Sequence, residues 1–186
     1  FKNDRSLSVE EKQTLVHWIE AGAPRGEGTD PLANFVHDWP EWGLGSPDVI
    51  VDIKNIPELK LMSEDGGTWT VGAAVSGMNI IDNDAFQTAW PGVCEGVALI
   101  GSVQVKGRAS IGGNLCNASP AADSVPALIA AGAIANIVGP VGSREEPVEN
   151  IVTGPGQTSL ANGELIVSFS FPAKQANSGD CYLRLT

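Results

Sequence analysis

The stretch SIGGNLCNASPAAD, which ends at Asp123, carries the densest set of side chains that could hold a ligand. Gly112 and Gly113 have no Cβ, so the backbone there can approach another group and present its N–H donors to an anion. Asn114 and Asn117 add amide groups, and Asp123 could accept a hydrogen bond from a hydroxyl. Such a set suits a diphosphate and a ribose, although the same residue types are also typical of an ordinary turn.

The cysteines and histidines do not form a recognisable site. Cys94, Cys116 and Cys181 stand in no C-x-x-C or C-x-x-C-H spacing. We therefore expect three free thiols that act as small buried residues in a reducing compartment, with disulfide or metal use as the alternative. His17 and His37 lie outside any metal-ligand spacing. No metal site and no catalytic residue are predicted.

Composition narrows the class of protein. The chain has 186 residues, 42% hydrophobic and 18% charged, which suits one globular domain or one domain plus a fragment. Its formal net charge is −11 and its lysines and arginines form no basic run, so we expect no nucleic-acid or anionic membrane partner. No apolar run reaches the roughly 18 residues of a membrane helix, and no leader is recognisable, so the predicted location is the cytoplasm.

The stretch lies within a region of interleaved strands and short helices that begins at Asp48. The pattern predicts an α+β fold with hairpin returns and mostly antiparallel strands. Strands are predicted over 49–53, 104–106, 133–138 and 164–171, and a hairpin over Glu58–Met62 and Thr68–Ala74. Two short helices are predicted within 78–99, on either side of Pro91, and another over 125–132. The quoted stretch is predicted to be a loop and 139–144 a turn.

Residues 1–47 differ from the rest of the chain in composition and hydrophobic pattern. A capping box that starts at Ser8 precedes an amphipathic helix over 9–20, and residues 24–47 are rich in proline and glycine and predict a linker. A domain boundary near residues 46–48 is the simplest explanation of this change in composition. NDRSLSVEEKQTLVHWIEAGAPRG also resembles the last helix and tail of c-type cytochrome-like domains, without the haem-attachment motif.

Longer segments resemble one known family. PDVIVDIKNIPEL at 47–59, TVGAAVS at 70–76, GPGQTSL at 154–160 and GELIVSFSFP at 163–172 are similar to segments of the flavin-binding subunit or domain of the molybdenum hydroxylases. The segment at 100–133, which contains the quoted stretch, resembles that family in nearly every position. The family includes xanthine dehydrogenase and the medium subunit of aerobic carbon monoxide dehydrogenase. The resemblance implies the middle subdomain of a PCMH-type, vanillyl-alcohol-oxidase-like FAD-binding domain over 48–186.

The resemblance also implies roles for individual residues. The turn around the FAD diphosphate is implied for Ser110, Ile111, Gly112, Gly113 and Asn114. Asn117 stands where a small polar residue contacts the cofactor, and Asp123 where a carboxylate holds the adenosine side, at a ribose hydroxyl. Gly101 is implied at the adenine-side wall and Ile166 near the flavin ring through its main chain.

The implied function is that of an oxidoreductase component. Electrons would pass from iron–sulfur clusters through FAD to an external acceptor, and the implied partners are a molybdopterin large subunit and an iron–sulfur small subunit. A family loop of the type A-G-G-x-x-L, the other half of the FAD clamp, is not found before Asp48. We therefore expect weak FAD binding by this chain and a possible junction of two unrelated gene pieces at 45–48. The alternative is a non-catalytic relic whose loop is only structural.

Overall fold

A computed structural model describes residues 8–22 and 51–184 of the chain, which falls into two compact units, Phe1–Ile50 and Val51–Thr186. Within the first unit the described element is helix α1 (Val9–Glu20). The N–H of Lys12 donates to the Ser8 carbonyl (3.0 Å) to close its first turn. The helix predicted over 9–20 is confirmed, whereas the predicted linker lies outside the described residues.

The second unit is built on a five-stranded sheet. Its strands are β1 (Met62–Asp65), β2 (Thr68–Gly72), β3 (Ile134–Gly139), β4 (Gly142–Pro147) and β7 (Leu165–Phe171). They lie in the order β1-β2-β7-β3-β4, and every neighbouring pair is antiparallel. A separate antiparallel pair is formed by β5 (Val152–Gly154) and β6 (Gln157–Thr158). The predicted α+β class with a mostly antiparallel sheet is confirmed.

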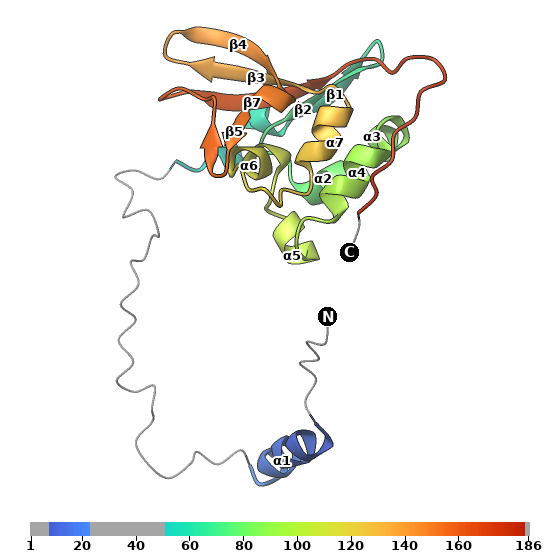
Figure 1. Cartoon of the computed structure of the whole chain (residues 1–186), viewed down its shortest axis with the longest axis vertical. Helices are drawn as coiled ribbons and strands as arrows, with labels where there is room; N and C mark the ends of the chain where they lie inside the picture. The colour runs from blue at the N-terminus through green and yellow to red at the C-terminus, as the bar shows by residue number, and fades with distance from the viewer. Residues whose placement is uncertain (1–7, 23–50, 185–186) are drawn as a thin grey trace. The chain divides into compact units, whose positions relative to one another are not determined.

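Short helices complete this unit and lie on one side of the sheet (Figure 1). The α-helices are α2 (Gly77–Ile81), α3 (Asp84–Ala89), α4 (Pro91–Ala98), α5 (Val103–Lys106), α6 (Ile111–Cys116) and α7 (Val125–Ala130). Single 3₁₀ turns occur at η1 (Ile53–Asn55), η2 (Pro57–Lys60) and η3 (Val148–Asn150). Helices this short are marginal in isolation, so their packing on the sheet must hold them in place.

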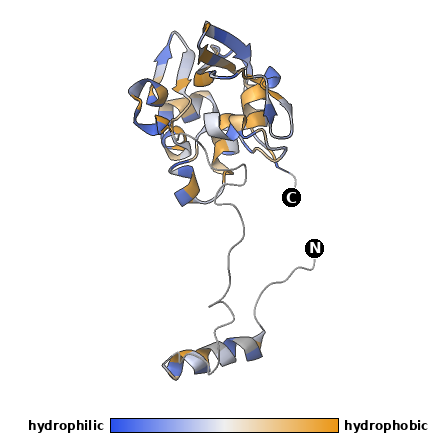
Figure 2. Ribbon diagram, turned by 90° about the vertical axis from the view of Figure 1, so that its left-hand side faces the viewer, coloured by the Kyte–Doolittle hydropathy of each residue, from blue (hydrophilic) through white to orange (hydrophobic). Residues whose placement is uncertain are grey.

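Alternation along the strands separates a buried face from a polar one. Val71 and Phe169 are paired in register and fully buried, and Phe171 lies two residues along on the same face. On the opposite face the amide of Asn136 donates to the hydroxyls of Ser168 and Ser170, both at 2.9 Å. Figure 2 shows the hydrophobic residues gathered inside the unit and hydrophilic residues on its outer strands and turns.

An aromatic cluster joins the sheet to the helices. The Phe86 ring of α3 lies edge-on to Trp69 (5.2 Å between centroids) and to Phe171 (5.3 Å), both at 77°. Such edge-to-face pairs add to the stabilisation from burial alone. The cluster fixes α3 against β2 and β7, and so fixes the frame in which the neighbouring helices pack.

The β4 edge of the sheet is charged. Arg144 binds the Glu164 carboxylate through two hydrogen bonds, at 2.8 and 2.9 Å, and Glu146 at 2.9 Å. The hydrogen bonds from Arg144, followed by the Ala161 N–H, lower the pKa of Glu164 from 4.5 to about 2. Charged side chains of this kind discourage pairing with another strand edge.

Several sequence predictions are wrong in detail. Ile53–Asn55 is a 3₁₀ turn where a strand over 49–53 is predicted, and residues 49–50 lie outside the described part. The predicted strand 104–106 is helix α5, because the Ser102 hydroxyl caps it by accepting from the Val105 N–H (3.4 Å). The predicted turn 139–144 contains the start of β4, and three helices rather than two occupy 77–98.

Candidate cofactor site

Residues 110–116 form the start and body of helix α6, where a loop is predicted. The Ser110 hydroxyl accepts a hydrogen bond from the Gly113 N–H (3.2 Å) and so caps the helix. Ile111 directly follows the residue that bridges Ser76, and both Ile111 and Gly112 are buried. The loop prediction is therefore wrong for these residues, which form a capped helix start.

The two adjacent glycines have different surroundings. A Cβ at Gly112 would lie 2.6 Å from the Ala73 carbonyl oxygen and 2.9 Å from the Ala73 Cβ. Gly112 is therefore required by the close approach of α6 to the chain that follows β2. Gly113 is exposed, and a Cβ there would meet only the Ser110 Oγ, at 3.4 Å. Packing therefore does not require a glycine at position 113.

A second serine-capped helix begins beside the first. Ser76 and Ser110 form an isolated antiparallel bridge, and the Gly77 N–H donates to the Ala109 carbonyl (2.8 Å). The Ser76 hydroxyl accepts from the Asn79 N–H (3.2 Å), which caps α2. The starts of α2 and α6 therefore lie side by side. Sequence reasoning missed Ser76, although a serine directly after a strand and before Gly77 is a helix-start signal.

Some basic residues of residues 51–184 form no ion pair with a carboxylate there, and one of them, Lys54, lies near the chain that leads into α6. In residues 51–184, Arg144, Lys174 and Arg184 form the ion pairs with carboxylates. The remaining basic residues of this part of the chain are Lys54, Lys60, Lys106 and Arg108.

The Lys54 ammonium donates to the Arg108 carbonyl, two residues before Ser110. Burial and then the charge of Arg108 lower the pKa of Lys54, while the nearby Asp52 carboxylate opposes this and Lys60 adds a smaller lowering effect. Lys54 thus brings one positive charge to the chain that leads into this helix start. The sequence gives no sign of it, because Lys54 and Arg108 are 54 residues apart.

Asn114 links the start of α6 to the start of α7. Its carbonyl Oδ1 accepts from the Ser124 hydroxyl (2.6 Å) and the Ser124 N–H (3.2 Å), and Ser124 is fully buried. The oxygen of Asn114 is therefore engaged within the fold. Asp123, next to Ser124, is partly buried, and its Oδ1 accepts from the Arg184 guanidinium (3.2 Å). Asn117 is exposed and caps the end of α6.

Ile166 is connected to the same region through the sheet. Its side chain is 2% exposed on β7, and the carbonyl of the next residue, Val167, accepts from the Ala73 N–H (3.0 Å). Ala73 in turn contacts Gly112. Gly101 (φ +50°) precedes α5, and its carbonyl accepts from the Lys106 ammonium (3.2 Å). No recorded contact of the described residues joins Gly101 directly to α6.

The cysteines are free thiols, as predicted, but not all are buried. Cys94 is buried, whereas Cys116 and Cys181 are exposed, so the expectation of three buried fillers is wrong for two of them. Cys116 is the last residue of helix α6, and Cys181 lies in the chain that follows β7. Burial raises the pKa of Cys94 to about 11, with smaller effects from Asp180 and Glu95. Within residues 8–22 and 51–184, no group of three acidic, His or Cys residues could hold a metal.

No helix in those same ranges is long and apolar enough to cross a membrane.

Comparison with known proteins identifies one family. The family described as "FAD binding domain in molybdopterin dehydrogenase" matches residues 37–174, beginning within the segment predicted as a linker. The chain is 35% identical over 125 residues to a xanthine dehydrogenase FAD-binding subunit of Escherichia coli O157:H7, covering 66% of this chain and 42% of that protein. It is 32% identical over 142 residues to a carbon monoxide dehydrogenase medium chain of Hydrogenophaga pseudoflava, covering 76% and 50%.

Solved structures agree with this likeness. Carbon monoxide dehydrogenase of Hydrogenophaga pseudoflava, in a form that lacks the Mo-pyranopterin moiety, superposes with a TM-score of 0.69 at 32% identity. That match covers 73% of this chain and 47% of the other. Quinoline 2-oxidoreductase of Pseudomonas putida 86 superposes with a TM-score of 0.67 at 26% identity, covering 70% and 46%. The chain thus spans about half the length of the relatives it matches.

Proposed function

The chain belongs to the family of FAD-binding domains in molybdopterin dehydrogenases, and from that premise we propose that the start of α6 holds the FAD diphosphate. The observation that carries this proposal is the environment of Gly113. Its backbone is exposed to solvent, and a Cβ there would meet only the Ser110 Oγ, at 3.4 Å. The Lys54 ammonium binds the Arg108 carbonyl, five residues before Gly113 in the chain. Together these groups suit a doubly charged phosphate ester.

Each implied residue has a role within this proposal. Ser110 orders the helix start, and the backbone of Ile111, Gly112 and Gly113 forms the turn around the diphosphate. Gly113 admits the diphosphate to the backbone. Asn114 acts mainly through Ser124, since its oxygen is engaged there.

The remaining implied residues serve the two ends of the cofactor. Asn117 contacts FAD from the end of α6. Asp123 accepts from a ribose hydroxyl with Oδ2, which has no hydrogen-bond partner among the described residues. Gly101 borders the adenine side, and the main chain of Ile166 lies near the flavin ring.

The flavin supplies the redox chemistry, and the protein binds and orients it. We propose that this domain receives electrons from an iron–sulfur small subunit that serves a molybdopterin large subunit, and delivers them to an external acceptor. The medium-chain relatives support this kind of assembly. Three free thiols support a reducing compartment such as the cytoplasm. No residue of the chain is assigned as a chemical catalyst.

The alternative is a domain in which α6 is only structural. The contact of Gly112 with Ala73 and the bond from Ser124 to Asn114 support it, because both serve packing. The suggested junction near 45–48, between a cytochrome-like tail over 1–47 and the flavin domain, also stays a proposal. Sequencing reads across codons 40–55 would test it, since an interrupted native read would reveal an assembly error.

A flavin titration separates the two functions. Purified chain is titrated into FAD and flavin fluorescence is recorded for wild type, Gly113→Val, Asp123→Ala and the control Val141→Ala. Val141 is fully exposed at the β3–β4 turn, so its truncation should change nothing. The proposal expects saturable binding in wild type and the control, and loss of at least tenfold in affinity in both site variants. Binding that is unaffected by Gly113→Val would contradict it.

A further inference from the structure

The segment that follows β7, residues 172–184, runs beside α3 and α4 without forming a helix or strand (Figure 1). Polar contacts hold it there. Asp180 Oδ2 accepts from the Gly92 N–H (2.7 Å), and Glu95 Oε2 accepts from the Tyr182 N–H (2.7 Å). The residue at the N-cap of α4, Trp90, offers no side-chain cap, so Asp180 supplies one from 88 residues away. We call residues 172–184 the post-β7 segment.

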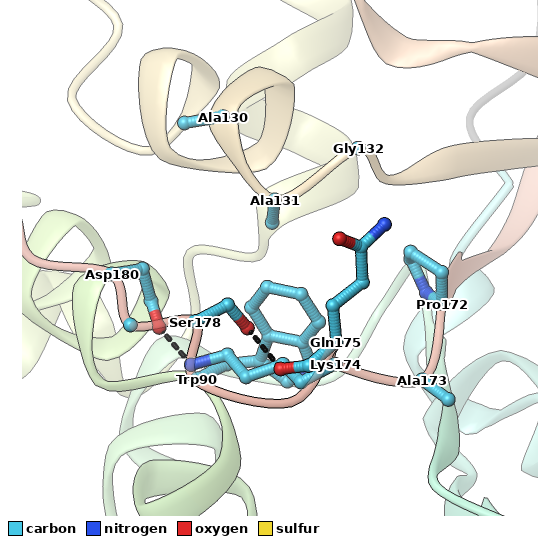
Figure 3. A pocket seen from close by; sticks show the side chains of 11 residues that line it. Trp90, Ala130, Ala131, Gly132, Pro172, Ala173, Lys174, Gln175, Ser178 and Asp180 are labelled. Atoms are coloured by element: carbon cyan, nitrogen blue, oxygen red, sulfur yellow. Dashed lines mark hydrogen bonds and ion pairs between the residues drawn. The ribbon is translucent and has the colours of Figure 1, made fainter.

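A half-buried cation anchors the first half of the post-β7 segment. The Lys174 ammonium lies 4.7 Å from the centroid of the Trp90 ring and forms an ion pair with Asp180. Figure 3 shows Lys174 beside Trp90 with the dashed line to Asp180, in a pocket bordered by the end of α7. The same carboxylate therefore binds Lys174 and caps α4, which fixes the path of the chain toward Tyr182.

Two glycines of α4 let the post-β7 segment approach closely. A Cβ at Gly92 would lie 2.7 Å from Asp180 Oδ2 and 3.0 Å from the Cys181 nitrogen. A Cβ at Gly96 would lie 3.2 Å from the Asp123 carbonyl oxygen and 3.4 Å from the Tyr182 ring. The Tyr182 ring and the Asp123 backbone thus meet over Gly96. Two residues later the chain delivers Arg184 to the Asp123 side chain.

The Arg184–Asp123 ion pair uses only one of the two carboxylate oxygens of Asp123. Arg184 Nη1 donates to Asp123 Oδ1 at 3.2 Å, and the two side chains are 54% and 24% exposed. This bond orients the carboxylate and leaves Oδ2 for another donor. The guanidinium also offsets a negative charge that would otherwise repel a nearby diphosphate. An ion pair this exposed contributes little to stability, so orientation and charge at the site better account for its effect.

We propose that Arg184 is a positioning residue for the adenosine ribose of FAD, acting through Asp123 and held in place by the post-β7 segment. The inference rests on the proposed function. It predicts a contribution to the adenosine half of the cofactor and none to the flavin half. Because the pair is exposed, the expected effect on affinity is modest, about three- to fivefold.

The test compares FAD with FMN, which has the flavin but not the adenosine. Dissociation constants are measured for the full chain as wild type, Arg184→Gln and Arg184→Lys. Lys12→Gln, which removes one positive charge from α1 in the other unit, is the charge-matched control. We expect Arg184→Gln to raise the dissociation constant for FAD three- to fivefold and to leave that for FMN unchanged. Arg184→Lys should restore part of the loss, and Lys12→Gln should match wild type.

Other results have distinct meanings. An unchanged FAD constant in Arg184→Gln, or equal losses for FAD and FMN, would overturn the positioning role while leaving the flavin site in place. A wild-type chain that binds neither flavin would overturn the proposed function, and this inference with it. Thermal melts of each variant show whether a loss of FAD affinity comes from unfolding. If Arg184→Gln unfolds, the comparison of FAD and FMN affinities is made with Arg184→Lys instead.

Discussion

Alanine at Gly112 and alanine at Gly113 should have opposite effects, although the two residues are adjacent. A methyl group at Gly112 would lie 2.6 Å from the Ala73 carbonyl oxygen. Ala73 cannot easily move away, because its N–H donates to the Val167 carbonyl in the sheet (3.0 Å). A methyl group at Gly113 would meet only the Ser110 hydroxyl at an ordinary contact distance of 3.4 Å.

The magnitudes follow from these distances. Overpacking of this kind costs about 1–3 kcal/mol, so Gly112→Ala should lower the melting temperature of the unit by roughly 3–12 °C. Gly113 lies in a helix and is exposed, so alanine should leave the free energy of unfolding unchanged or raise it by up to about 1 kcal/mol. The same methyl would hinder a phosphate at the backbone. Loss of one charge-assisted hydrogen bond, about 1.5–3 kcal/mol, weakens FAD binding roughly ten- to a hundredfold.

Two assays on the same samples decide the matter. Thermal melts followed by circular dichroism report stability, and fluorescence titration with FAD reports affinity. We expect Gly112→Ala to be unstable, and Gly113→Ala to be stable but impaired in FAD binding. If Gly113→Ala melted as early as Gly112→Ala, the steric reasoning would be refuted. If it bound FAD as wild type does, the ligand role of Gly113 would be refuted.

Three further predictions concern other sites. The carboxyl of Glu164, whose pKa is lowered to about 2, stabilises the fold above pH 4.5, so the stability advantage over Glu164→Gln should shrink as pH falls from 4.5 toward 2 in acid melts. At pH 8 iodoacetamide should label exposed Cys181 first and Cys94 last, as mass spectrometry can show. Asn114→Ala should cost about 1–3 kcal/mol in denaturant titration, because the buried Ser124 hydroxyl loses its acceptor; an unchanged midpoint would contradict this role.

The elements that sequence predicted well are those with long or clearly bounded patterns. Helix α1 has a capping box and a glycine stop, and α7 has a proline in its first turn. Strands β7 and β3 are long and rich in apolar residues, with seven and six residues. In each case the local pattern agrees with the tertiary environment, so single-sequence reasoning suffices.

The errors fall where tertiary contacts decide. Residues 103–106 contain two valines and favour a strand by propensity, yet the Ser102 cap makes them helical. Residues 111–116 contain two glycines, and their helix is held by the contact of Gly112 with Ala73. The approach of Lys54 to Arg108 joins residues far apart in the chain. Neither propensity nor spacing encodes such contacts.

The candidate site therefore depends on the end of the sheet more than on its own sequence. Helix α6 has six residues and α2 has five, too few to persist alone. Both begin beside the chain that leaves β2, where Ser76 bridges Ser110 and Ala73 meets Gly112. The donors of α6 can point in a fixed direction only while β2 stays paired with β7. It follows that substitutions which loosen this pairing, far from any ligand, should weaken an anion site as much as substitutions within it.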